Sequence, residues 1–312
     1  MMDRRRILGA LGGGGMLMAS RASASGPYAD RSAGRVRLSL AAYSFRSFFA
    51  FQRGKPSARP KEEQIGMEDF LTYASREGWD GAELTSYFLD PNLSSRNAFA
   101  LRRQAFLQGI EVSGTAVGNN FTLPPGSERD AQIQYVKGWI ERAAAMGAPH
   151  VRIFAGKHGA DLPKEKAMER VVECLKEVGD FAGERGVFLG VENHDSVGDA
   201  ETLLGVIRAA DHPWIGVNLD TGNFRTEDPY EDMAEAAPYA VNVQLKVELK
   251  RLHAEQKEPT DFARVAKILR EANYQGYLAL EYEANENPYE AVPRFHQQIR
   301  EAFGQPASFS LK

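Results

Sequence analysis

The chain has 312 residues, of which 43% are hydrophobic and 26% charged, a composition typical of a globular protein with a large core. Its formal net charge is −4, and it carries no basic stripe or nucleic-acid-binding motif, which argues against a nucleic-acid partner. The single cysteine, Cys174, excludes an internal disulfide and a cysteine-rich metal site.

Residues 1–24 are predicted to be a signal peptide rather than part of the fold. They combine a basic start, a short apolar region over 7–19 and the sequence Ala-Ser-Ala at 22–24, which has the small-residue pattern of a cleavage site. The apolar region is too short for a stable membrane anchor. The sequence "DRRRIL" at 3–8 resembles the twin-arginine export motif. We therefore expect export by the twin-arginine machinery, cleavage after Ala24, a periplasmic or exported protein, and a flexible segment over 25–35.

The rest of the chain contains eight short apolar runs that are candidate strands. Most of them are nearly continuous in apolar residues, which is typical of parallel strands covered on both faces. The runs cover residues 36–45, 80–86, 110–117, 150–156, 187–193, 214–220, 241–247 and 276–283.

Long amphipathic stretches separate these runs, as at 127–147, 163–186 and 259–276, where apolar residues recur at helical spacing. Eight alternations of strand and helix predict an α/β fold, a single (β/α)8 TIM barrel over residues 36–306. An open doubly wound sheet is the alternative, but no glycine-rich phosphate loop follows the first strand. The stretch 51–64 is predicted to be a long loop over the mouth of the barrel.

Polar residues stand at the ends of the last four predicted strands. Active sites of such barrels lie at the carboxyl ends of the strands, so these residues can converge although they are far apart in the chain. Three carboxylates and an amide oxygen that meet in an apolar setting repel one another unless a cation compensates them, and oxygen ligands favour Mn²⁺ or Mg²⁺. The four residues are Glu192, Asp220, Gln244 and Glu281.

Four short sequences around these residues resemble the sugar phosphate isomerase/epimerase family with a xylose-isomerase-like barrel. They are "GVENH", "GVNLDTGN", "VQLKVE" and "LALEYE", and the resemblance extends over about residues 36–305. The resemblance implies one divalent metal ion held by Glu192, Asp220, Gln244 and Glu281, with Mn²⁺ expected first and Mg²⁺, Co²⁺ or Zn²⁺ as alternatives. Gln244 departs from the family, which usually has His there.

The resemblance also implies proton transfer next to a carbonyl, with Glu192 and Glu281 on opposite faces of the substrate. Lys246 is a third catalytic candidate that can neutralise an enolate oxygen, or else pair with Asp220 or Glu283. The candidate substrate-binding residues are Glu83, Asn119, Arg152 and His194. Each has a structural alternative: Glu83 can pair with Arg152, Asn119 can form a turn, and His194 can support a ligand or face solvent.

The expected function is that of a metal-dependent isomerase or epimerase of a small carbohydrate. An exported protein without a phosphate-binding glycine loop favours a non-phosphorylated sugar or keto-sugar. Two alternatives remain open, a 3-keto-glycoside lyase or keto-polyol dehydratase with the same metal and bases, and a barrel that binds sugar without turnover. An oligomer is possible.

Overall fold

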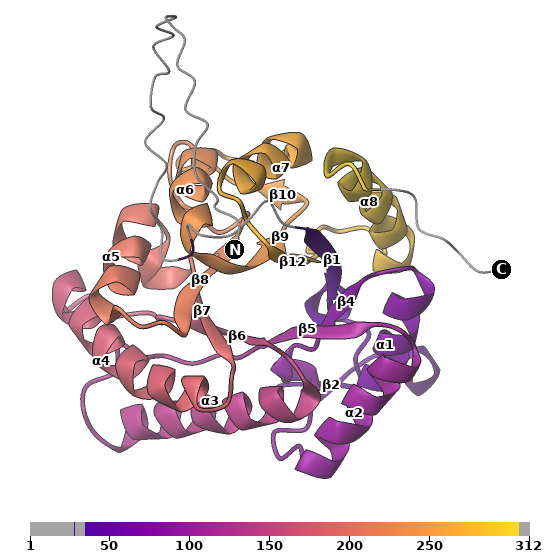
Figure 1. Ribbon diagram of the computed structural model, residues 1–312, viewed down its shortest axis with the longest axis horizontal. Helices are drawn as coiled ribbons and strands as arrows, with labels where there is room; N and C mark the ends of the chain where they lie inside the picture. Colours follow the sequence, from indigo (N-terminus) through magenta and orange to yellow (C-terminus); the bar gives the residue numbers. More distant parts are fainter. Residues whose placement is uncertain (1–27, 29–34, 306–312) are drawn as a thin grey trace, which may run out of the picture.

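A computed structural model describes residue 28 and residues 35–305, which include a closed barrel of eight parallel strands. The predicted TIM barrel is thereby confirmed (Figure 1). Around the barrel the strands follow the order β1-β12-β9-β8-β7-β6-β5-β4, so chain neighbours are also barrel neighbours once the short hairpin strands are set aside. The barrel strands are β1 (Val36–Ala41), β4 (Gly81–Glu83), β5 (Glu111–Ala116), β6 (His150–Phe154), β7 (Phe188–Glu192), β8 (Ile215–Asp220), β9 (Ala240–Leu245) and β12 (Gly276–Leu280).

Helices form the outer ring around this barrel (Figure 1). Their apolar faces pack against the strands, and the core is one continuous cluster of buried side chains. In the part of the chain that the structure describes, no helix has the length and apolar character needed to cross a membrane. The helices are α1 (Met67–Arg76), α2 (Ser95–Leu107), α3 (Ser127–Met146), α4 (Lys164–Gly183), α5 (Ala200–Ala210), α6 (Pro229–Ala236), α7 (Phe262–Glu271) and α8 (Pro288–Ala302).

Several predicted strands are too long at their carboxyl ends. The run at 36–45 is a strand only to Ala41 and continues as a 3₁₀ turn, η1 (Ala42–Phe45), and the last strand stops at Leu280. The Ser44 hydroxyl donates to the Leu280 carbonyl and accepts from the Tyr282 N–H, so it joins this turn to the segment after β12. Glu281 and Glu283 therefore lie in a loop that is tied to η1.

The prediction of a long loop over 51–64 is wrong in part. Two short strands, β2 (Phe51–Gln52) and β3 (Lys55–Pro56), form an antiparallel hairpin, and η2 (Lys61–Glu63) follows. Arg53 and Gly54 make the turn with positive φ angles of 52° and 75°. The remaining short elements are η3 (Ser86–Phe88), η4 (Asp195–Val197), η5 (Ala237–Tyr239), β10 (Glu248–Leu249) and β11 (Glu258–Pro259).

The predicted signal peptide at 1–24 lies outside the described residues, and so does most of the segment 25–35. Tyr28 and Arg35 are the described residues within that segment. The Tyr28 side chain contacts the barrel. Its hydroxyl donates to the carbonyl of Ile215 at 3.2 Å, and its ring lies edge-on to Phe188 at 6.2 Å. Tyr28 thus contacts the first residues of β7 and β8, at the end of the barrel opposite the candidate site.

The interior of the barrel is partly polar, and two glycines make this possible. His150 of β6 lies between Gly114 and Gly190, where an added Cβ would come within 2.6 Å of Nδ1 and 2.9 Å of Nε2. Burial and, to a lesser extent, the nearby Arg152 together lower the pKa of His150 to about 3, so the imidazole is neutral at physiological pH. His150 is a packed interior side chain.

The N-cap of α5 gives a testable pH effect. The Asp199 side chain accepts the Thr202 N–H at 2.7 Å. Burial alone would raise the pKa of Asp199, but the Thr202 hydrogen bonds and Lys164 outweigh it and hold the pKa below its usual 3.8. Asp199→Ala is expected to lower the free energy of unfolding by about 1 kcal/mol at pH 7. Because the folded-state pKa is depressed, this difference should shrink as the pH falls below 3.8. Urea titrations at several pH values measure it, and a difference that grows in acid would contradict the assignment.

Candidate active site

A cavity of about 450 Å³ opens at the carboxyl ends of the strands. Carboxylates and cations of the predicted set line it, among them Glu192, Glu281, Lys246 and Arg152. Arg53, at the tip of the β2–β3 hairpin, also lines the cavity, which confirms that this segment lies at the barrel mouth. The site therefore has the location expected for an active site of this fold.

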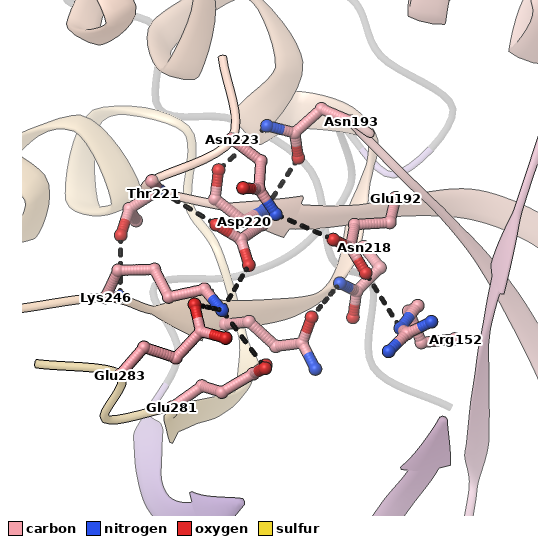
Figure 2. A network of polar contacts seen from close by, with 12 residues as sticks. Arg152, Glu192, Asn193, Asn218, Asp220, Thr221, Asn223, Lys246, Glu281 and Glu283 are labelled. Atoms are coloured by element: carbon pink, nitrogen blue, oxygen red, sulfur yellow. Dashed lines mark hydrogen bonds and ion pairs between the residues drawn. The ribbon is translucent and has the colours of Figure 1, made fainter. Parts of the chain in front are cut away.

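Lys246 follows β9 and places its ammonium group among three carboxylates (Figure 2). Nζ lies 2.8 Å from Glu283 Oε2, 3.0 Å from Glu281 Oε1 and 3.4 Å from Asp220 Oδ2. Burial alone would lower the pKa of Lys246, but these carboxylates outweigh it and raise the pKa well above its ordinary value. The surrounding carboxylates therefore favour the charged form of Lys246 in the site.

The backbone around β8 directs Lys246 toward this position. The Thr221 hydroxyl accepts the Lys246 N–H at 2.9 Å, and the Gly222 N–H donates to Asp220 Oδ1 at 2.8 Å. Gly222 also leaves room for the lysine stem, because an added Cβ would lie 2.7 Å from Lys246 Cγ. The "DTG" of the sequence thus positions one carboxylate and one lysine together.

Gly222→Ala is expected to lower turnover about 10- to 100-fold, because the new methyl group must displace the Lys246 stem and misplace its ammonium group. The exchange or turnover assay described below measures this loss. Gly205→Ala is the matched control, since an added Cβ there meets nothing within 4 Å. Equal rates for the two variants would show that Gly222 does not position Lys246.

A second charged pair occupies the other side of the site (Figure 2). Arg152 of β6 lies with Nε 2.8 Å from Glu192 Oε2 at the end of β7, and both side chains are about 95% buried. Asn223 donates to the other oxygen of Glu192 at 2.8 Å. Arg152 is held in turn by the Val117 carbonyl, to which it donates at 2.8 Å. Glu192 therefore has both oxygens fixed.

Gln244 belongs to a chain of side-chain amides inside the barrel. Asn242 donates to Asn218, Asn218 donates to the Gln244 carbonyl oxygen, and Gln244 donates to Glu83, at 2.8, 2.8 and 2.9 Å. Glu83 accepts the last hydrogen bond of this chain through Oε1. Burial, with Glu281 adding to it, raises the pKa of Glu83 to about 7. The oxygen of Gln244 is thus turned toward Asn218.

The four predicted metal ligands do not fit a divalent ion as they are arranged. Gln244 gives its oxygen to Asn218, and Glu192 gives both oxygens to Asn223 and Arg152. Asp220 and Glu281 direct oxygens to the Lys246 ammonium. Over the described residues, no group of three or more His, Cys, Asp or Glu side chains is arranged to hold a metal ion. No metal step is therefore derived from this site.

The structure brings most of the predicted site residues together. Glu192, Lys246 and Glu281 line the cavity, and Asp220 is buried against Lys246. Glu83 and Gln244 do not line it but contact each other. Asn119 and His194 also line the cavity but have other partners. Asn119 exchanges two hydrogen bonds with the backbone of Phe154, and His194 is paired with Asp195 at 3.1 Å. Their predicted roles in substrate binding stay predictions.

Three site residues were not predicted from the sequence. Asn193 exchanges two hydrogen bonds with the backbone of Asp220, and Asn218 and Asn223 bind Gln244 and Glu192. Each stands within three residues of a predicted ligand, in "VENH" or "NLDTGN". An amide next to a strand-end carboxylate is the signal that could have identified them.

The family of the chain follows from a model that matches residues 71–299, that of the xylose isomerase-like TIM barrel. The chain belongs to this family.

Solved structures agree on the fold. A D-psicose 3-epimerase, solved in the presence of D-fructose, is 14% identical with a TM-score of 0.70 and matches 86% of this chain and 100% of its own. A 3-keto-D-glucoside 4-epimerase from E. coli is 15% identical with a TM-score of 0.66, over 86% and 100%. A xylose isomerase-like TIM barrel protein from Mycobacterium smegmatis, in complex with magnesium, is 16% identical with a TM-score of 0.67, over 87% and 98%. At such identities the likeness establishes the fold, not the reaction.

Proposed function

We propose that this protein is a sugar isomerase or epimerase that transfers a proton at a carbon next to a carbonyl group. The observation that carries the proposal is the pair of carboxylates Glu192 and Glu281, which line one cavity and are held by different cations, Arg152 and Lys246. The two similar structures named as epimerases support the same class of reaction. The carboxylate pair separates this site from that of a barrel that only binds sugar.

Glu281 is the proposed base. Burial raises the pKa of Glu281, although Lys246 opposes this effect, and a more basic carboxylate is a better proton acceptor. Removal of the proton leaves a negative charge on the former carbonyl oxygen, which Lys246 can stabilise through its ammonium group. Return of the proton to the former carbonyl carbon, with the hydroxyl proton of the adjacent carbon passing to the former carbonyl oxygen, gives isomerisation. Return of a proton to the opposite face of the original carbon gives epimerisation, and it requires Glu192 to enter the cycle protonated while Glu281 keeps the proton that it removed.

The proposed substrate is a non-phosphorylated sugar or keto-sugar. Four acidic and three basic side chains line the cavity, and Arg152 and Lys246 are already paired with acids. A phosphate dianion would meet this excess of carboxylates, whereas sugar hydroxyls can donate to them. We also propose that the protein is exported and cleaved after Ala24. The donors present do not fit the expected Mn²⁺ ion, so the proposed proton transfer uses the protein's own side chains.

Deuterium incorporation tests this proposal. The purified protein is incubated in D₂O with free ketoses, aldoses and 3-keto-glycosides, and ¹H NMR follows the loss of the C–H signal beside the carbonyl. We expect exchange with at least one of these sugars and a new epimer or isomer. Release of the C1 substituent instead would favour the lyase alternative. No exchange with any sugar of the panel would overturn the proposed function.

A further inference from the structure

We propose that the Lys246 ammonium group is the resident cation of this site and stands where the sequence predicts a divalent metal ion. The catalytic role of Lys246 rests on the proposed function. The identity of the cation that the carboxylates hold does not, and it can be tested separately. It also restricts the class of substrate. One N–H of the ammonium group can hydrogen-bond a single substrate oxygen, whereas a metal ion can chelate two oxygens.

The first argument is the set of carboxylates around Nζ. Nζ donates a hydrogen bond to Glu283 Oε2 at 2.8 Å and lies within ion-pair distance of Glu281 and Asp220, at 3.0 and 3.4 Å. The Lys246 side chain is only 8% exposed, and a buried charge of this kind persists only when it is paired. Two of these carboxylates are predicted metal ligands, so the lysine holds the oxygens that a metal ion would need.

The second argument is that the lysine is built into the strand ends. Its N–H is bonded to Thr221, its stem runs past Gly222, and its carboxylate partners come from β8 and from the segment after β12. That segment is itself fixed through Ser44. The position of Nζ is therefore determined by several elements rather than by one flexible side chain.

The third argument is the orientation of Gln244, which stands where the family usually has a ligand. Its oxygen accepts from Asn218 and its amide nitrogen donates to Glu83. To offer the oxygen elsewhere, Gln244 would have to give up the hydrogen bond from Asn218, which is unfavourable for buried groups. The amide that would complete a metal site is thus already hydrogen-bonded to other side chains of the protein through both its oxygen and its nitrogen.

The substrate expected from this geometry is a ketose or keto-glycoside that is bound through a single carbonyl oxygen. That oxygen would accept from Nζ while Glu281, 3.0 Å from the same nitrogen, faces the adjacent carbon. A neighbouring hydroxyl suited to chelation is then not required. A 3-keto-glycoside lacking the 2-hydroxyl group should accordingly still bind, although it loses any contact that the hydroxyl makes.

Metal binding by the apo protein tests the inference without reference to activity. The purified chain is dialysed against EDTA and then titrated with Mn²⁺, with free Mn²⁺ followed by electron paramagnetic resonance. The wild type and the control Lys164→Gln, an exposed lysine paired with Asp199, are expected to bind no stoichiometric Mn²⁺. Lys246→Gln is expected to bind it, because the variant leaves the carboxylates without their cation. One Mn²⁺ per wild-type chain would overturn the proposal.

A second variant provides a test of the inference that does not depend on whether Lys246→Gln folds. Gln244→His introduces the usual family ligand but keeps Lys246, and it is expected to bind no stoichiometric Mn²⁺. Tight binding by this variant would show that Gln244, not Lys246, excludes the metal, and would contradict the inference. In the deuterium assay, EDTA should leave the wild-type rate unchanged, and Lys246→Gln should lower it about 10²- to 10³-fold. If the wild type binds no metal and exchanges no sugar, the proposed function is refuted, whereas the inference about Lys246 is not.

Discussion

Glu281→Gln is expected to lower kcat by about 10²- to 10⁴-fold, because the amide cannot accept the substrate proton. The substitution preserves the shape of the side chain, and its carbonyl oxygen can still accept from Lys246, which lies 3.0 Å from Glu281 Oε1. Binding of the sugar should therefore change less than the rate. The measurement is kcat and KM on the sugar identified by deuterium exchange, together with the exchange rate itself.

Glu177→Gln is the matched control for this prediction. Glu177 is also paired with a lysine, Lys137, at 2.7 Å, but it is half exposed on the outside of the barrel. Its substitution should leave kcat unchanged. If Glu281→Gln retained wild-type kcat, Glu281 could not be the base, and the carboxylate pair would have to be reassigned around Glu192.

Arg152→Met is expected to lower the free energy of unfolding by about 3–5 kcal/mol, because it leaves the carboxylate of Glu192 buried without its cation. The two side chains are 5% and 4% exposed and lie 2.8 Å apart. The substitution also removes the donor that binds the Val117 carbonyl. Urea denaturation followed by circular dichroism measures the loss.

A double substitution separates the charge effect from packing. Arg152→Met combined with Glu192→Gln removes both charges and should recover part of the lost stability. Arg37→Met provides the exposed comparison, since Arg37 and Glu111 are 40% and 60% exposed, and its cost should stay below about 1 kcal/mol. If Arg152→Met lowers the free energy of unfolding no more than Arg37→Met does, burial does not determine how strongly the Arg152–Glu192 pair stabilises the protein.

The barrel could be predicted because its signal is local. Apolar runs and amphipathic stretches alternate along the chain, and each strand of the closed barrel overlaps a predicted run, with Ala240 of β9 one residue outside its run. The strand ends could not be predicted, because they depend on contacts between distant residues. The bonds of Ser44 with Leu280 and Tyr282 are an example, since they join segments more than two hundred residues apart in sequence.

The location of the site could be predicted from the sequence, but the hydrogen bonds and ion pairs within it could not. Carboxylates at successive strand ends indicated where the groups gather, and the structure places them at one cavity. Whether Lys246 pairs with Asp220 or Glu283 was open, and the structure shows it against both and against Glu281. The direction of Gln244 depends on Asn218 and Glu83, which come from two other strands. No spacing along the chain encodes that choice.

The amide chain from Asn242 to Glu83 has a consequence for how the family diverges. Asn218 and Gln244 each both donate and accept, so the orientation of one amide sets that of the next. A relative with His in place of Gln244 loses the oxygen that receives the Asn218 hydrogen bond. We therefore expect the residues at positions 83, 218, 242 and 244 to change together among relatives. Such covariation would indicate that relatives have one of two alternative hydrogen-bond arrangements inside the barrel.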